Sequence, residues 1–326
     1  MRMIVGVDLG GTSIVVGTIP EDGHTIHGVD SQPTPVDTGF SGVVEKIAEM
    51  VQGSVAATRD DLGGDIEIAG VGVGAPGPLD TKRGLVVLTP NLGWTNAPLR
   101  DRVAEATGLP AALDNDANCA TFGEWWRGAA QQARIAVGIT IGTGIGGGIV
   151  LDGKIFHGAS DVAGEIGHTT VDSTGRRCGC GNYGCLEAYA SGPAIAARAR
   201  EGLETGVPSS LPDYVAGDLT RITAQTVYDA AKDGDEFARE VVKETAKILG
   251  AGVANIINVI NPEVVVIMGG VTLAGDRLFV PLIAEVKRRA FRPAVEACRI
   301  VPGALTGTAG VYGAVASFKV QHWGAV

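Results

Sequence analysis

The sequence predicts an α/β protein with two lobes and a duplicated core, and three observations carry this prediction. The chain has 326 residues, which exceeds one typical domain, and chains of this size usually divide around separate cores. Short β-branched runs alternate with helical patterns, as in sheets that are covered by helices. A plan of strand, glycine turn and strand occurs twice, near residues 3–18 and 135–151.

The expected elements follow from these patterns in chain order. The first glycine turn, 8–13, separates expected strands at 3–7 and 14–18, and the second, 142–148, separates strands at 135–141 and 149–151. The remaining strands are expected at 66–74, 111–114 and 264–268, and the helices at 42–58, 98–107, 118–129, 192–204, 224–231, 235–261 and 276–289. Asn261-Pro262 is a natural stop for the longest helix.

Composition and charge limit the partners of this chain. Hydrophobic residues make up 45% and charged residues 19%, which is typical of a packed globular protein. The net charge of −10 gives no general attraction to nucleic acids or anionic membranes, so neither is expected as a partner. The N-terminus lacks the long apolar region of a secretory signal, and no run of 18 apolar residues occurs. We therefore expect a cytoplasmic protein whose thiols are reduced.

Two glycine turns are candidate phosphate-binding loops, because backbone N–H groups without side chains let a phosphate approach closely. The first is Asp8-Leu9-Gly10-Gly11-Thr12, where an acidic residue beside a phosphate suggests a divalent cation between them. The second, Gly142 to Gly148, has five glycines in seven positions, more than a hairpin needs. No helix follows it, which argues against a dinucleotide-binding motif. A turn without a ligand remains the alternative for each.

Two further segments lie where strands are expected to end. Gly269-Gly270 follows the apolar run 264–268 and could hold an adenosine, or it could be an ordinary turn into a helix. The segment 114–118, Asp-Asn-Asp-Ala-Asn, follows another apolar strand. One of its carboxylates could accept a proton from a substrate hydroxyl while Asn115 orients that hydroxyl. Helix capping by Asp114 or Asp116 explains the segment equally well.

A cluster of potential metal ligands is the most specific local feature. His168 is followed by Cys178, Cys180 and Cys185, and three cysteines with one histidine form a common ligand set for structural Zn²⁺. Clustered reduced thiols without metal are the alternative. Glu165 and Glu187 bracket this segment, and a loop stiffened by metal could present both carboxylates to neighbouring sugar hydroxyls. Exposed charges without a role remain possible for both.

Taken together, these motifs resemble the ROK family of bacterial sugar kinases and regulators. The most specific parts are GEIGH at 164–168 and CGCGNYGCLE at 178–187, and DLGGT, GAPGP, DNDAN and GTGIGGG occur in the order of the family. The resemblance implies the actin-like ATPase fold, a duplicated ribonuclease H-like core with two lobes around a cleft. The expected lobes are 1–114 joined by about 309–326, and 115–308 with the zinc knuckle and the nucleotide site.

The resemblance also implies a role for each matching residue. Asp116 would be the catalytic base, and the sugar would contact Asp116 together with Gly77, Asn91, Asn115, Glu165, His168 and Glu187. His168 would offer one ring nitrogen to Zn²⁺ and the other to the sugar, while the three cysteines complete the structural zinc site. ATP phosphates and Mg²⁺ would lie against Asp8, Gly10, Gly11 and Thr12, further phosphate contacts would come from Thr143 and Gly144, and Gly270 would contact the nucleotide.

The subfamily is indicated by the loop Asn91-Leu92-Gly93-Trp94, which resembles that of glucokinases. The expected reaction is therefore ATP-dependent phosphorylation of glucose at the 6-hydroxyl. A kinase for fructose, mannose or N-acetylmannosamine, or a sugar-sensing regulator without catalysis, is the alternative. The cysteines favour ATP over polyphosphate, and the few residues before Asp8 leave no room for the DNA-binding segment of regulators. Members of the family are commonly dimers or tetramers, so a homo-oligomer is expected.

Overall fold

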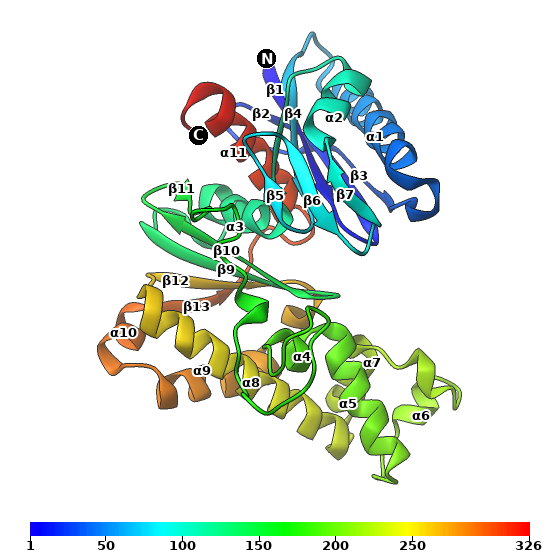
Figure 1. Cartoon of the computed structure of the whole chain (residues 1–326), viewed down its shortest axis with the longest axis vertical. Coiled ribbons are helices and arrows are strands. Elements are labelled where there is room, and N and C mark those ends of the chain that lie inside the picture. The colour runs from blue at the N-terminus through cyan, green and yellow to red at the C-terminus, as the bar shows by residue number, and fades with distance from the viewer. The chain divides into compact units, whose positions relative to one another are not determined.

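The computed structural model describes all residues 1–326, and the chain divides into two compact units (Figure 1). Unit 1 comprises Met1–Gly138, Gly148–Gly164 and Gly303–Val326, and unit 2 comprises Ile139–Gly147 and Glu165–Pro302. The lobes expected from the sequence, with a boundary after residue 114, remain a prediction about domains. No helix is both long enough and apolar enough to cross a lipid bilayer.

The main sheet of unit 1 has the strand order β3-β2-β1-β4-β8. Neighbours β1 and β2 are antiparallel, as are β2 and β3, whereas β1, β4 and β8 run parallel to one another. The five strands are β1 (Arg2–Leu9), β2 (Ser13–Pro20), β3 (His27–Pro33), β4 (Glu67–Ala75) and β8 (Ala111–Asn115). The two strands predicted around the first glycine turn are therefore confirmed as a hairpin.

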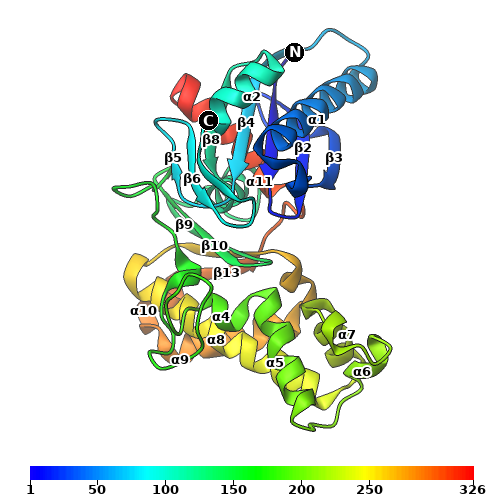
Figure 2. The same cartoon turned by 45° about the vertical axis from the view of Figure 1, so that its right-hand side comes forward.

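Helices cover both faces of this sheet (Figures 1 and 2). One face packs against α1 (Gly39–Leu62) and α2 (Leu99–Thr107), where alternate apolar residues of β1 join the core. The other face packs against α3 (Asp116–Arg127) and α11 (Ala309–Trp323). Since side chains alternate along a strand, Gly6 and Asp8 of β1 point to the face that α11 covers.

Glycines allow α11 to approach the sheet and α3 closely. A Cβ atom on Gly6 of β1 would overlap the Val311 carbonyl, and one on Gly72 of β4 would overlap that of Ala314. On the helix itself, a Cβ on Gly313 would overlap the carbonyl of Cys119 in α3. The abundance of glycine thus reflects close packing as well as turns.

A second five-stranded sheet repeats the order of the first. Its order is β11-β10-β9-β12-β13, so in both sheets the strands follow the pattern third, second, first, fourth, fifth. This repetition confirms the duplicated core. The strands are β9 (Ile135–Ile141), β10 (Ile145–Leu151), β11 (Lys154–Ile155), β12 (Val264–Met268) and β13 (Arg299–Pro302), and the division between the units runs through β9 and β10.

Unit 2 is otherwise helical, with α8 at its centre. The helix α8 contacts α4, α5, α7 and α9, begins after the side-chain cap of Asp235 and ends at Asn261, which has a φ of 52°. The predicted stop at Asn261-Pro262 is confirmed. The helices are α4 (Glu187–Ala190), α5 (Gly192–Glu204), α6 (Leu211–Tyr214), α7 (Ala224–Asp233), α8 (Glu236–Ile260), α9 (Asp276–Arg289) and α10 (Arg292–Ala297).

One sequence prediction about the second glycine turn is wrong. The predicted seven-residue loop 142–148 is short, because β10 begins at Ile145 and includes Gly146 to Gly148. The physical reason at Gly148 is packing: a Cβ there would lie 2.5 Å from Oγ1 of Thr121 in α3. Only residues 142–144 remain outside the strands. The small sheet β5-β6-β7 (Leu79–Asp80, Leu85–Thr89, Trp94–Ala97) was not predicted at all.

We expect Gly313→Ala to lower the free energy of unfolding by about 1–3 kcal/mol, because the added methyl group overpacks the contact with α3. Alanine alone would favour a helix by about 1 kcal/mol. The matched control is Gly53→Ala in α1, whose added Cβ meets no atom within 4 Å and which should not destabilise. Urea unfolding measures both, and equal effects of the two substitutions would contradict the packing account.

Candidate active site

Parallel pairing brings the ends of three strands, two of them carrying aspartates, to one edge of the main sheet in unit 1. Asp8 of β1 pairs with Gly74 of β4, and Gly74 pairs with Asp114 of β8. A Cβ on Gly74 would lie 3.5 Å from Cα of Asp116, so the glycine leaves room for the start of α3. This is the carboxyl edge of parallel strands, where ligands of α/β proteins bind.

The carboxylate of Asp8 lies in an environment that disfavours its charge. Burial and the negative charge of Asp116 together raise the pKa of Asp8 to about 7. The carboxylate also lies against the first turn of α11, where a Cβ on Gly310 would overlap it. A divalent cation beside Asp8 would favour the ionised form of both acids. The residues present therefore fit the Mg²⁺ that the resemblance implies.

Asn115, rather than Asp114 or Asp116, caps helix α3. Its Oδ1 accepts hydrogen bonds from the N–H groups of Ala117 (2.9 Å) and Asn118 (3.1 Å). Its Nδ2 donates to the Gly77 carbonyl at 3.3 Å. The N-cap residue is therefore Asn115 and neither aspartate, although Asp116 Oδ1 also accepts the Ala117 N–H at 2.8 Å. Asp116 is the first residue of the helix and is half-buried.

Two other predicted sugar residues lie near this edge. Gly77 has a φ of 93°, and a Cβ there would overlap the Leu88 carbonyl, so the turn requires glycine. Asn91 is exposed and lies beside the first glycine turn, because a Cβ on Gly11 would be 3.5 Å from the Asn91 Cβ. In that turn, the Gly10 N–H donates to the Ser13 carbonyl at 2.8 Å.

In unit 2, the four predicted zinc ligands form one cluster. Their ligand atoms all lie within 4.8 Å of one another. Sγ of Cys178 is 3.7 Å from Nδ1 of His168, and Sγ of Cys180 is 3.7 Å from Sγ of Cys185. Tetrahedral Zn²⁺ with bonds of about 2.3 Å to sulfur places two sulfurs about 3.8 Å apart. The types of donor atom and the two separations of 3.7 Å therefore fit a four-coordinate zinc ion.

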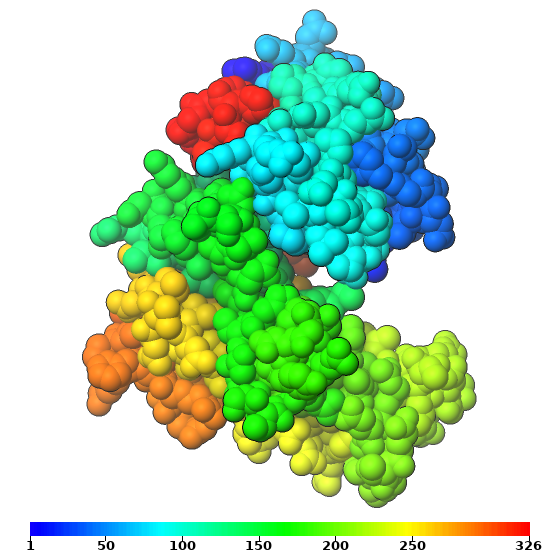
Figure 3. All heavy atoms as spheres, in the orientation of Figure 1, coloured from blue at the N-terminus to red at the C-terminus, as the bar shows by residue number.

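Backbone hydrogen bonds hold the segment that carries these ligands. The Cys178 N–H donates to the Asn182 carbonyl at 2.8 Å, and the Leu186 N–H donates to the Thr169 carbonyl at 2.9 Å. Cys178 and Cys185 are buried and Cys180 is exposed. Figure 3 shows this segment, in green, on the face of unit 2 turned to the viewer.

Glu187 connects the zinc cluster with the second glycine turn. Its Oε2 accepts the Ile145 N–H at 2.8 Å, and its Oε1 lies 3.7 Å from Sγ of Cys178. His168 turns its other nitrogen, Nε2, toward Glu165, whose Oε2 is 3.9 Å away. Unit 2 therefore brings Glu165, His168 and Glu187 together around the cluster, as the sequence suggested. Their roles stay predictions.

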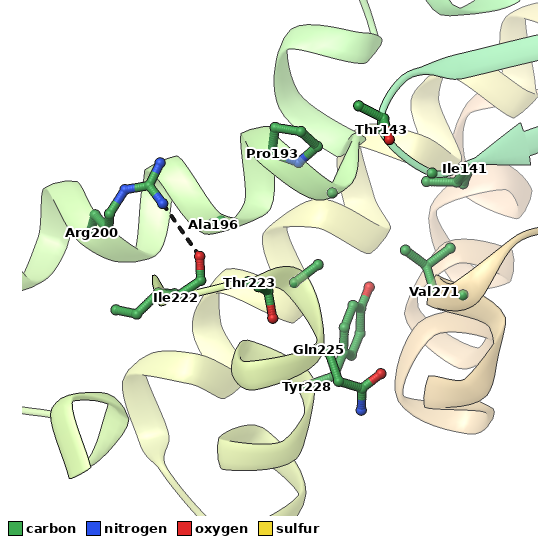
Figure 4. A pocket seen from close by; sticks show the side chains of 14 residues that line it. Ile141, Thr143, Pro193, Ala196, Arg200, Ile222, Thr223, Gln225, Tyr228 and Val271 are labelled. Carbon is green, nitrogen blue, oxygen red and sulfur yellow. Dashed lines mark hydrogen bonds between the residues drawn. The ribbon is translucent and has the colours of Figure 1, made fainter. Parts of the chain in front are cut away.

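A cavity of about 440 Å³ lies beside the second glycine turn of unit 2 (Figure 4). Its size is typical of small-molecule sites. The cavity is lined by Thr143 and Gly270 from the predicted nucleotide set, and by residues of α5 and α7 that the sequence did not single out. Gly269, with a φ of 97°, lets the chain pass the Ile141 carbonyl closely. Gly144 does not line this cavity and packs against Glu187 instead.

Tyr228 of α7 is a notable member of the cavity wall that sequence reasoning missed. Its ring reaches into the space bounded by Thr143 and Val271 (Figure 4). The residue is only 9% exposed, and its hydroxyl is buried without a hydrogen-bond partner. Burial raises the pKa of this tyrosine. An unpaired buried hydroxyl is costly, and a polar ligand atom in the cavity would relieve that cost.

A second cavity, of about 350 Å³, adjoins the zinc segment. Thr143 lines both cavities, and Cys178 and Glu187 line only the second. Within unit 2, the glycine turn thus lies between the zinc cluster and the larger cavity. Arg176 and Arg177 also face the second cavity, although Arg176 is paired with Glu201.

Comparison with known proteins identifies the family. The sequence model of the ROK family matches residues 4–321. The chain belongs to the ROK family. A protein named glucokinase from Thermotoga maritima is 38% identical over 322 residues, which cover 98% of both chains. The family resemblance drawn from the motifs is confirmed over nearly the full length.

Solved structures of ROK proteins show the same fold. One is a ROK family glucokinase from Streptomyces griseus in complex with glucose and AMPPNP, with a TM-score of 0.81, 34% identity and coverage of 96% of this chain and 98% of that one. A ROK family transcriptional regulator, a homolog of the E. coli MLC protein, has a TM-score of 0.83 at 26% identity and covers 96% of this chain and 77% of that one. The actin-like fold is confirmed, and fold alone does not separate ROK kinases from regulators.

Proposed function

We propose that this ROK protein is a glucokinase, which transfers the γ-phosphoryl group of ATP to the 6-hydroxyl of glucose and releases ADP. The observation that carries this proposal is the position of Asp116 directly after β8, at the carboxyl edge of β1, β4 and β8, where its negative charge acts on Asp8. Support also comes from glucokinases that match nearly the whole chain, one of them solved with glucose and an ATP analogue.

Asp116 would act as the catalytic base of the reaction. Its carboxylate would accept the proton of the 6-hydroxyl while the oxygen bonds to the γ-phosphorus and the bond to the ADP oxygen breaks. Asn115 would keep the start of α3 in place through its cap and its bond to Gly77. Gly77, Asn91, Asn115, Glu165, His168 and Glu187 would contact the sugar. Paired carboxylates suit vicinal hydroxyls because each oxygen can accept a hydrogen bond.

Nucleotide phosphates and Mg²⁺ would be held near Asp8, Gly10, Gly11 and Thr12, with Thr143 and Gly144 as further phosphate contacts. Bound Mg²⁺ supplies charge neutralisation at the phosphate oxygens. The cavity lined by Thr143, Gly270 and Tyr228 fits the adenosine in position and size. We also propose that His168, Cys178, Cys180 and Cys185 bind one structural Zn²⁺, which keeps the segment between Glu165 and Glu187 rigid.

The setting proposed for this enzyme follows from its chemistry. Three cysteines that serve as ligands must stay reduced, which suits the cytoplasm. Glucose 6-phosphate feeds glycolysis, so we place the reaction at the entry of glucose into carbohydrate metabolism. A homodimer or homotetramer is proposed from the family alone.

A coupled assay tests the function directly. Purified protein with Mg²⁺ should phosphorylate glucose with ATP at a higher kcat/KM than fructose, mannose or N-acetylmannosamine, and ATP should be preferred to polyphosphate. A higher kcat/KM for another hexose would make that sugar the substrate. Absence of turnover with every sugar and donor, while sugar still binds, would favour a sugar-sensing regulator.

Asp116→Asn should lower kcat about 10²- to 10⁴-fold, because the amide cannot accept the hydroxyl proton. Glucose binding, measured by calorimetry, should persist. The matched control is Asp276→Asn, which changes an exposed aspartate at the first position of another helix, α9, and should leave kcat unchanged. If kcat of Asp116→Asn were close to that of the control, Asp116 would not be the base.

Cys180→Ser should reduce the zinc content from about one ion per chain toward zero, because one of four ligands is lost. Elemental analysis after dialysis measures the metal. Cys298→Ser is the control, since Cys298 lies outside the cluster. Loss of zinc should also raise the KM for glucose, because the segment carrying Glu165 and Glu187 loosens. An unchanged zinc content in Cys180→Ser would rule out the proposed ligand set.

Tyr228→Phe should have opposite effects on stability and on nucleotide binding. Without ligand, the melting temperature should stay equal or rise, because an unsatisfied hydroxyl is removed. ATP should bind about 2- to 13-fold more weakly, which corresponds to a lost hydrogen bond of about 0.5–1.5 kcal/mol. Tyr214→Phe is the control, because that exposed hydroxyl donates to Asp233 outside the cavity. Unchanged ATP affinity would place the nucleotide away from Tyr228.

A further inference from the structure

Asp114 of unit 1 is a buried carboxylate that no role described so far explains. It is only 2% exposed and is the second-last residue of β8, directly before Asn115. Its Oδ1 accepts hydrogen bonds from the Asn115 N–H at 2.8 Å and from Nδ2 of Asn118 at 3.3 Å. Its Oδ2 accepts one from the Ser317 hydroxyl of α11 at 3.2 Å. Three structural segments therefore meet at this one carboxylate.

The fourth partner of Asp114 is His157, from the segment that follows β11. Nε2 of His157 lies 3.1 Å from Oδ1 and 3.0 Å from Oδ2, so the ring nitrogen donates between both oxygens. The His157 side chain is 32% exposed. A buried carboxylate is costly unless it is paired and hydrogen-bonded. An imidazolium at this distance supplies the countercharge.

Other charged groups near this pair are acidic. Asp161 faces His157, and Asp161 is itself held by the N–H (2.9 Å) and hydroxyl (2.8 Å) of Thr81. On the side of α3, burial raises the pKa of the Cys119 thiol, and the negative charges of Asp114, Asp8 and Asp116 raise it further. Three aspartates thus lie close together in unit 1, and His157 is the cationic partner of the most buried one.

The contacts of Asp114 fix the main chain that carries the proposed base. It accepts the N–H of Asn115 directly and holds the side chain of Asn118 one turn into α3. Asn115 in turn caps α3 and bonds to Gly77. Without the countercharge of His157, the Asp114 carboxylate would be buried and unpaired, which is costly, and this network would have to rearrange.

We propose that His157 is a positioning residue for the phosphoryl transfer, which pairs with the Asp114 carboxylate and thereby fixes Asn115 against the Gly77 turn and Asp116 at the start of α3. The inference rests on the proposed function, because it assumes Asp116 as the base. His157 acts through Asp114, so it is a positioning residue and does not take part in the proton transfer.

The protonation of His157 gives this arrangement a pH dependence. Hydrogen bonding to Asp114 raises the pKa of His157, although its partial burial acts in the opposite direction, and the charges of Asp114 and Asp161 add to the rise. The imidazolium is therefore retained below this raised pKa and is lost as the pH rises through it. Turnover should fall on the alkaline side as the countercharge of Asp114 disappears.

The test compares His157→Ala, His157→Gln, Asp114→Asn and the double variant His157→Gln/Asp114→Asn in steady-state turnover and in nucleotide binding. His157→Ala should lower kcat/KM for glucose about 10- to 100-fold, as for a misplaced reacting group, while calorimetric affinity for AMPPNP stays within about 2-fold of that of the wild type. His157→Gln keeps a hydrogen-bond donor but no charge, so its kcat/KM should decrease less than that of His157→Ala. The pH profile of its turnover should lack the decrease at alkaline pH. The double variant should be no worse than Asp114→Asn alone, because both substitutions break one interaction.

His27→Gln is the matched control, because His27 also pairs with an aspartate. Its Nδ1 lies 2.6 Å from Oδ2 of Asp61, whose side chain is 63% exposed. This pair connects β3 with α1 and makes no contact with Asp114. The control should retain wild-type kcat/KM and the wild-type pH profile.

Two results would overturn the inference. One is His157→Ala with wild-type kcat/KM. The other is a His157→Gln variant in which kcat/KM for glucose and the affinity for AMPPNP decrease by the same factor, while turnover still falls at alkaline pH. That pattern would indicate a general loss of folding.

Crystal structures of the wild type and His157→Ala separate this inference from the proposed function. In the variant, Nδ2 of Asn115 should move away from the Gly77 carbonyl, which is 3.3 Å distant in the wild type. An unchanged distance would contradict the positioning role even if the wild type phosphorylates no sugar. A wild type without turnover would count against the proposed function alone.

Discussion

The register of the parallel strands β1, β4 and β8 is the constraint on which the proposed catalytic edge depends. It places Asp8, Gly74 and Asp114 side by side at one edge of the main sheet. Neighbouring strands are about 4.8 Å apart, so the order of the strands alone brings these acidic segments together. The close approach of α11 completes the arrangement, because Gly310 leaves space for the Asp8 carboxylate and Ser317 reaches Asp114.

The three aspartates at this edge differ in how their charge is compensated. Asp114 is buried and paired with His157, whereas Asp8 has a pKa raised to about 7 by burial and by Asp116. A Mg²⁺ ion beside Asp8 would supply the compensation that the protein itself provides for Asp114. Within unit 2, the thiol cluster, Glu187 and the Ile145 N–H are connected by contacts beside the glycine turn.

Much of the fold and part of the site could be predicted from the sequence, because they depend on local patterns. Short β-branched runs around a glycine turn located the first hairpin, a helical pattern located the long helix, and the spacing of three cysteines and one histidine located the metal cluster. What escaped prediction depends on contacts distant in sequence. The partnership of His157 with Asp114 spans 43 residues, and that of Ser317 with Asp114 spans 203. Tyr228 carries no local motif, and Gly148 was assigned to a loop because packing against Thr121 cannot be seen in the sequence.

The central claim is that Asp116 meets the 6-hydroxyl of glucose at the common edge of three parallel strands. A crystal structure with glucose, Mg²⁺ and AMPPNP tests it most directly. The account predicts the 6-hydroxyl oxygen about 2.6–3.2 Å from a carboxylate oxygen of Asp116, the range of a hydrogen bond that can transfer a proton, with the metal ion adjacent to Asp8. Glucose bound with another hydroxyl toward Asp116, or bound away from this edge, would contradict the account.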